Sequence, residues 1–235
     1  MPLLDHFHPP LSERRQWHAF HHAWATFLAA DLNRQLPPGY FAEPNVQFGV
    51  EIGVAAFEDD EVGASAVWVP PAPTQTVRFS LVTDVVEVQI FNREAGPVLA
   101  GAIDLVSPAN KDRPAHRDAF VSKCAALLQS GVGLMILDVV TTRAADLHEE
   151  LLRRLATTSA ASHADLWAAS YRPVKENGET ELAIWHSSLS VGTALPALPF
   201  WLKNGPCLSL DLELSYARTC RELAILGYGP STGLE

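Results

Sequence analysis

Three acidic residues stand alone inside segments that are otherwise mostly apolar: Glu51, Glu87 and Asp104. Burying a carboxylate costs free energy unless a cation or a hydrogen-bond donor compensates for it. Two carboxylates that meet would also repel each other unless a positive charge lies between them. The acids are therefore candidates for one polar site. The alternative, that each acid faces solvent on a half-exposed sheet, stays open at this point.

The strand that carries Asp104 has a neighbour in the sequence that could bring a second acid to it. Residues 92–97 are Asn-Arg-Glu-Ala-Gly-Pro, a composition typical of a turn. If this turn joins two strands as a hairpin, Glu87 falls opposite Ile103 or Asp104. Side chains alternate across a strand, so Asp104 shares a face with Ala102.

Two lysines could supply the compensating charge. Lys123 belongs to a predicted helix over residues 114–130 and has Phe120 and Leu127 at helical spacing. It could point into a cleft at the end of the sheet, or it could lie at the rim with its ammonium in water. Lys111, in the polar stretch before that helix, is the second candidate.

Hydrophobic periodicity and turn signals predict the elements that must position these residues. Strands dominate the first half and helices alternate with strands in the second, which indicates a mixed α+β or α/β class with a central mixed sheet flanked by helices. The predicted elements, in chain order, are a helix over 12–35; strands over 46–57, 64–69, 77–91 and 98–106; a helix over 114–130; a strand over 134–140; helices over 144–156 and 161–169; a strand over 183–191; an extended connection over 195–200; a strand over 208–214; and a helix over 215–225.

Length and composition favour one domain over residues 1–235. Within it we expect an N-terminal helical segment over 1–40, a sheet-and-helix core over 41–142 and a C-terminal extension of helices and strands over 143–235. The hydrophobic fraction of 48% is ample for a buried core, and the charged fraction of 19% is too low for a disordered chain.

Charge and cysteine content restrict the partners and the compartment. The net charge of −10 disfavours broad, non-specific binding to nucleic acid, although it leaves room for a small basic groove. The three cysteines form no close pair, and we read no export signal and no membrane span, so we expect a reduced, cytoplasmic setting. One local basic cluster could either meet phosphates or be a solvated loop; it consists of Lys111, Arg113, His116 and Arg117.

A zinc site is a weaker alternative. His18 and His22 are four residues apart on the first predicted helix, which is a metal-ligand spacing. No Cys partner and no HExxH pattern accompanies them. His21, one turn from Trp17, is better explained as a packed polar residue or part of a cleft wall.

A longer motif follows Asp104. The residues Leu-Val-Ser-Pro-Ala-Asn lead from it to Lys111, the next helix carries Phe-x-x-Lys with Lys123 at its end, and an apolar strand ending in Asp138 comes next. These residues resemble the signature of a bacterial family called domain of unknown function 4058, whose pattern is Glu-x-Leu-Ser-Pro-x-Asn-Lys, then Tyr-x-x-Lys, then an apolar strand with an Asp. Residues 17–21 and 195–199 also match, so the resemblance spans most of the chain.

The resemblance extends to the Uma-type, endonuclease-like proteins of the PD-(D/E)XK group and implies a restriction-endonuclease-like core. Asp104 stands at the place of the family's strand Glu, and Lys123 at that of its helix-borne lysine. The acid of an earlier strand is replaced by Gly53, and Glu51 lies two residues away on the same strand face.

The implied activity is metal-dependent hydrolysis of a phosphodiester. Mg²⁺ or Mn²⁺ would be held by Asp104, Glu51 and Glu87. The catalytic residues would be Asp104, Glu87, Lys123 and Lys111. The implied partner is nucleic acid in a local cleft. The rival interpretation is a non-catalytic descendant that uses the same fold for binding or assembly. The oligomeric state stays open, with a homodimer among the alternatives.

Overall fold

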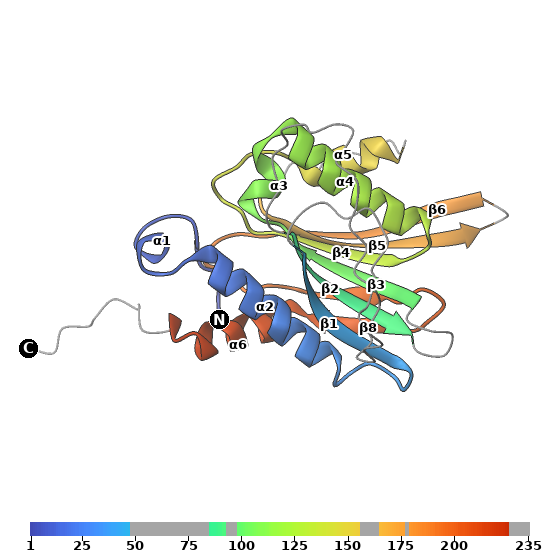
Figure 1. Cartoon of the computed structure of the whole chain (residues 1–235), viewed down its shortest axis with the longest axis horizontal. Helices are drawn as coiled ribbons and strands as arrows, with labels where there is room; N and C mark the ends of the chain where they lie inside the picture. Colours follow the sequence, from blue (N-terminus) through green and yellow to red (C-terminus); the bar gives the residue numbers. More distant parts are fainter. Residues whose placement is uncertain (48–84, 93–97, 156–164, 177–178, 226–235) are drawn as a thin grey trace, which may run out of the picture.

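The computed structural model describes residues 1–47, 85–92, 98–155, 165–176 and 179–225 (Figure 1). For Glu87 it describes the backbone alone. No helix within these ranges is long and apolar enough to cross a bilayer.

A six-stranded mixed sheet forms the centre of the molecule, with its strands side by side in chain order. All neighbouring strands are antiparallel except β3 and β4, which are parallel. Parallel neighbours need a crossover, and here it contains α3 (Pro108–Asp112) and α4 (Pro114–Gln129). The strands are β1 (Tyr40–Gln47), β2 (Val85–Asn92), β3 (Val98–Leu105), β4 (Gly133–Asp138), β5 (Trp167–Glu176) and β6 (Glu179–Ser188).

Helices cover both faces of this sheet, which confirms the predicted α+β class with a mixed sheet flanked by helices (Figure 1). One face packs against α2 (Trp17–Leu32), α6 (Leu212–Glu222) and the hairpin of β7 (Ala197–Trp201) and β8 (Cys207–Asp211). The other face packs against α4 and α5 (Leu147–Arg154).

Strand β3 shows how side-chain alternation divides the two cores. Ile103 and Leu105 belong to the core under α2 and α6, whereas Ala102 and Val106 belong to the core under α4 and α5. Asp104 alternates with the second set, so it lies on the face that α4 covers. This placement agrees with the predicted strand over 98–106.

The predicted helix over 12–35 was wrong in one respect, because it is two helices. α1 (Leu11–Arg14) and α2 are separated by Arg15 and Gln16 in extended conformation. In one continuous helix, Leu11 and Trp17 would point roughly 120° apart. The break lets both side chains enter the same core.

Several strand and helix boundaries also differ from the prediction. The helix over 161–169 was wrong where it is described, since Trp167 begins β5 and is buried beside β4. The extended connection over 195–200 contains β7, and the strand over 208–214 ends at Asp211, whose side chain caps α6. β1 begins at Tyr40, earlier than the predicted strand over 46–57. The predicted strand over 64–69 lies outside the described residues.

Candidate functional site

The β3–crossover–β4 unit places two carboxylates on one face of the sheet. Asp104, the penultimate residue of β3, is in register with Ile136 of β4. Asp138 lies two residues beyond Ile136, so it falls on the same face. Both residues are buried, with 1% of Asp104 and none of Asp138 accessible to solvent. Each therefore needs a compensating partner.

Lys123 of α4 is the partner of Asp104. Its Nζ donates a hydrogen bond to Oδ1 of Asp104 over 2.6 Å, and the thiol of Cys124 lies 3.6 Å from Oδ2. The Lys123 side chain is 29% exposed while that of Asp104 is 1% exposed, so the ion pair reaches solvent from the lysine side. We call Asp104–Lys123 the open pair.

Lys111 does not join the open pair. Its Nζ lies 2.8 Å from Oδ2 of Asp138, and the two side chains are 1% and 0% exposed. The Val140 N–H donates to the other oxygen, Oδ1, of Asp138. We call Lys111–Asp138 the sealed pair. Burial raises the pKa of Asp138 to about 6, although the charge and hydrogen bond of Lys111 act in the opposite direction.

The Ser-Pro-Ala-Asn segment explains how Lys111 becomes buried. Ser107, two residues after the end of β3, is the N-cap of α3, with Pro108 at the first helical position. Oδ1 of Asn110 accepts a 2.8 Å hydrogen bond from the Ser107 N–H, so this capping box closes the start of the helix. The sequence was interpreted as a polar loop here. The short helix instead directs Lys111 back against β4.

Glu87 occupies one of the two positions that the hairpin interpretation allowed. The antiparallel register of β2 and β3 pairs Glu87 with Asp104. The strand beside Asp104 is thus residues 85–92. Glu51 and Gly53 both lie outside the described residues.

The basic cluster around the start of α4 is largely paired within the protein. Arg117 forms an ion pair with Glu150 at 3.0 Å, Lys111 is buried in the sealed pair, and the ring of His116 bonds the carbonyl of Ala109. These contacts favour a structural interpretation of the cluster over a groove for phosphates.

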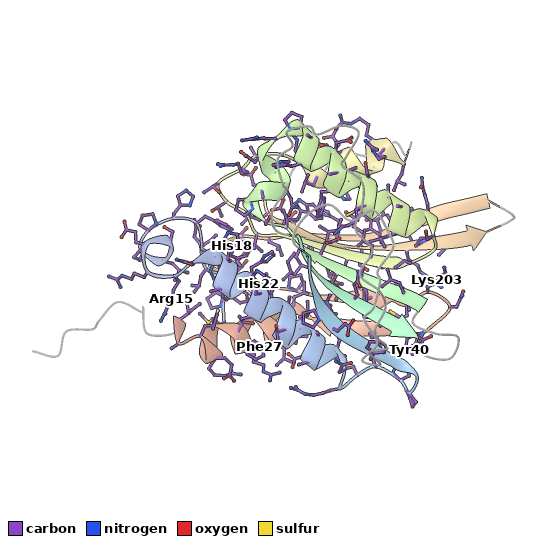
Figure 2. The ribbon with its side chains drawn as sticks, viewed as in Figure 1. Arg15, His18, His22, Phe27, Tyr40 and Lys203 are labelled. Carbon is purple, nitrogen blue, oxygen red and sulfur yellow. The ribbon has the colours of Figure 1, made fainter. Side chains whose placement is uncertain are left out.

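Within the described ranges, no group of three or more His, Cys, Asp or Glu side chains is arranged to hold a metal ion. His18 and His22 lie one turn apart on α2 without such a third ligand (Figure 2). The ring of His21 is buried, and its Nε2 lies 2.8 Å from the carbonyl oxygen of Leu105. Burial lowers its pKa to about 3, so His21 is a neutral packed residue, in line with the predicted alternative.

A second polar layer adjoins the open pair, and the sequence patterns did not reveal it. Nδ1 of His148 lies 2.6 Å from the Tyr171 hydroxyl, and its ring centroid is 4.9 Å from that of His186. Burial lowers the pKa of both histidines, and it raises the pKa of Tyr171 with help from the nearby Cys124 and Asp146. These residues come from α5, β5 and β6, and no short motif links them.

No family model, curated protein or solved structure matches the chain. The family resemblance of the motif after Asp104 therefore stays a prediction, and the functional argument depends on the geometry of the open pair.

Proposed function

We propose that the protein is a metal-dependent nuclease with a restriction-endonuclease-like core, in which Asp104 is the central metal ligand and Lys123 the basic residue beside it. The observation that carries the proposal is the 2.6 Å contact between Nζ of Lys123 and Oδ1 of Asp104, with the backbone of Glu87 in register on the next strand. A helix crossing between β3 and β4 brings the lysine over the acid.

The donor set suits a hard divalent ion. Side chains directly opposite on antiparallel strands have Cβ atoms roughly 4.5–5.5 Å apart on one face of the sheet. The proposal accordingly assigns the carboxylates of Asp104 and Glu87 to one Mg²⁺ or Mn²⁺ ion, which takes oxygen ligands and keeps several waters. Glu51 remains the third proposed ligand. Such an ion supplies an activated water and stabilises charge on a phosphate.

The protein's own groups have defined roles in this proposal. Asp104 is held by the register of β3 with β4, so its carboxylate is positioned before any ligand arrives. Lys123 is a point charge on a flexible stem that reaches solvent, so its ammonium can leave Asp104 and contact a phosphate oxygen. Lys111 is sealed against Asp138, and we assign it a positioning role for β4 in place of a catalytic one.

A cleavage assay tests this proposal. The purified chain is incubated with single- and double-stranded DNA and RNA in Mg²⁺ or Mn²⁺, with a chelator as reference. Asp104→Asn should reduce cleavage by about 100-fold or more, since one group that stabilises transition-state charge typically contributes that much. Lys123→Met should also reduce it.

Asp165→Asn is the matched control, because Asp165 is exposed and the substitution makes the same change of charge and shape. Cleavage by the control should equal that of the unmodified chain. Metal-dependent cleavage that survives Asp104→Asn would contradict the proposal.

The second candidate is a non-catalytic protein that retains this fold for binding or assembly. The sealed pair favours it, since Lys111 and Asp138 show that a lysine–aspartate pair here can serve the fold alone. This alternative predicts no cleavage under any metal condition, and no effect of divalent ions on unfolding of the unmodified protein.

A further inference from the structure

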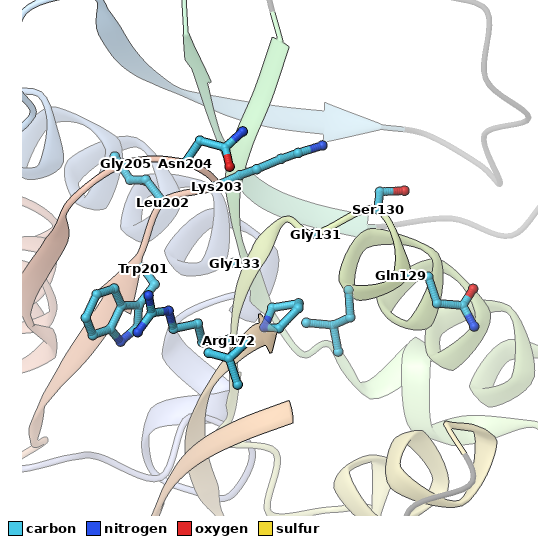
Figure 3. A pocket seen from close by; sticks show the side chains of 13 residues that line it. Gln129, Ser130, Gly131, Gly133, Arg172, Trp201, Leu202, Lys203, Asn204 and Gly205 are labelled. Atoms are coloured by element: carbon cyan, nitrogen blue, oxygen red, sulfur yellow. The ribbon is translucent and has the colours of Figure 1, made fainter. Parts of the chain in front are cut away.

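Figure 3 shows a pocket with a volume of about 580 Å³, whose lining includes neither residue of the open pair. It is formed by the end of α4, the start of β4, the middle of β5 and the β7–β8 turn. Gly133 of β4 is one of its lining residues, whereas Asp104 is in register with Ile136, roughly 10 Å further along the sheet. The lining residues are Leu128–Gly131, Gly133, Arg172–Val174 and Trp201–Gly205.

Close backbone packing fixes the wall that the β7–β8 turn contributes. A Cβ at Gly133 would lie 1.7 Å from the carbonyl oxygen of Trp201, so only glycine permits this approach. A Cβ at Gly205 would lie 2.8 Å from the Tyr40 hydroxyl. The Lys203 N–H also donates a 2.7 Å hydrogen bond to the carbonyl of Ala100. The turn is therefore held against the sheet, and the hollow beside it is a fixed feature of the fold.

The lining of this pocket is basic in an acidic protein. It contains Arg172 and Lys203 but no Asp or Glu, although the chain carries a net charge of −10. Within the part of the chain that the structure describes, neither cation forms an ion pair with a carboxylate. Both cations line the same hollow, so an anion bound in it would be attracted by each of them.

Arg172 is oriented by an aromatic stack. Its guanidinium carbon lies 3.6 Å from the centroid of the Trp201 ring, and Trp185 stacks with Trp201 at 6.2 Å. A guanidinium that stacks on an indole presents its N–H donors in a fixed plane, which suits the paired oxygens of a phosphate.

Lys203 reaches toward the end of α4 beside Gly131, where an added Cβ would lie 3.7 Å from its Cε atom (Figure 3). The partial negative charge of a helix C-terminus could by itself attract this lysine. However, Gly131 and Val132 donate their N–H groups to the carbonyls of Leu128 and Leu127, which satisfies these two acceptors.

We propose that this pocket binds the phosphate group of a small phosphorylated molecule, with Arg172 and Lys203 as the oxyanion ligands. Its volume lies in the usual range for small-molecule sites. The net charge of the chain and the pairing of its other basic cluster argue against a long polyanion as the ligand. The site is independent of the open pair and of the proposed nuclease activity.

Titration calorimetry of the full chain with inorganic phosphate, pyrophosphate and ADP, each at low salt, tests the proposal. At least one should bind, and Lys203→Gln should weaken that binding by about tenfold or more, the scale of one charge-assisted hydrogen bond. Asn204→Asp should weaken it as well, since it adds a negative charge to the exposed rim without a change of size. Asn204 has a φ of 54°, which Asp tolerates.

Arg153→Gln is the control, because it removes one exposed positive charge from α5. This variant should bind the phosphate compound as the unmodified chain does. Absence of binding by all three compounds, equal weakening in Arg153→Gln, or unchanged affinity in both Lys203→Gln and Asn204→Asp would overturn the proposal. Binding of a single-stranded oligonucleotide with none of the three compounds bound would also overturn it.

Discussion

The open and sealed pairs have the same chemistry and nearly the same place in the sheet, yet they differ in access to water. Both aspartates lie on the α4 face of parallel neighbouring strands, and each accepts a hydrogen bond from a lysine. Lys111 is 1% exposed, whereas Lys123 is 29% exposed. The comparison separates an ion pair that solvent reaches from one side from an ion pair that solvent does not reach.

The difference arises from the helices that carry the lysines. Lys111 sits in the last turn of α3, which begins at the Ser107 capping box, and its Nζ contacts Asp138 at the end of β4. Lys123 projects from the middle of α4 toward the sheet, with its Nζ 5.5 Å from the ring centroid of Phe120. A short capped helix thus seals one charge, and the side of a longer helix leaves the other at the surface.

The largest expected effect is that of Lys111→Met. Removing one partner of a buried ion pair leaves an uncompensated charge, which typically costs about 3–5 kcal/mol. We expect a loss of that size in the free energy of unfolding, measured by urea denaturation at pH 7. A loss below about 1 kcal/mol would mean that the pair is not sealed.

The pH dependence of the sealed pair comes next. Because the folded-state pKa of Asp138 is raised from 3.8 to about 6, the folded protein holds this proton more tightly than the unfolded chain. Protonation of Asp138 therefore contributes to the free energy of unfolding, on the order of 2–3 kcal/mol. This contribution is fully present below about pH 4 and is lost as the pH rises through 6. The unfolding free energy of the unmodified protein minus that of Asp138→Asn should fall between pH 4 and 6.5. If this free-energy difference rises between pH 4 and 6.5, the pKa of Asp138 is not raised in the folded protein.

Lys123→Met should cost less than Lys111→Met, about 1–2 kcal/mol in the same urea experiment. Water can reach the exposed side of the open pair, so the remaining Asp104 carboxylate is partly compensated. The order of the two losses matters more than their size, and a reversed order would invalidate the distinction between the pairs.

Ser107→Ala should have the smallest effect, about 1 kcal/mol, because it removes the side-chain half of the α3 cap. Protection of the α3 amides, measured by hydrogen exchange, should decrease while that of α4 changes little. Equal loss of protection in both helices would show that α3 does not open independently of α4, and that the cap at Ser107 does not by itself keep Lys111 buried.

The sequence predicted the parts of the site that depend on local pattern. Alternation along the strand predicted that Asp104 shares a face with Ala102. The turn composition of residues 92–97 predicted Glu87 opposite Ile103 or Asp104, and the observed register selects Asp104. Helical spacing put Lys123 on the same face as Phe120 and Leu127 but left open whether it points into a cleft or lies at the rim; its contact with Asp104 decides this.

The rest depended on contacts between distant segments. Lys111 and Asp138 are 27 residues apart, and their pairing requires a short helix whose Asn at the third position is an uncommon capping-box residue. Trp167 and its alanine neighbours read as a helix, but burial between β4 and β6 makes them a strand. The pocket between α4 and the β7–β8 turn was not predicted, because Arg172 and Lys203 share no motif.

The central claim, that Asp104 in the open pair is a metal ligand, is tested most directly by thermal unfolding in saturating Mg²⁺ or Mn²⁺. At about 100 times its Kd, a bound ion should raise the Tm of the unmodified chain by roughly 5–10 °C. We predict this shift in the unmodified chain and in Asp165→Asn, and its loss in Asp104→Asn. An unchanged Tm in the unmodified chain, or an equal shift in Asp104→Asn, would contradict the account.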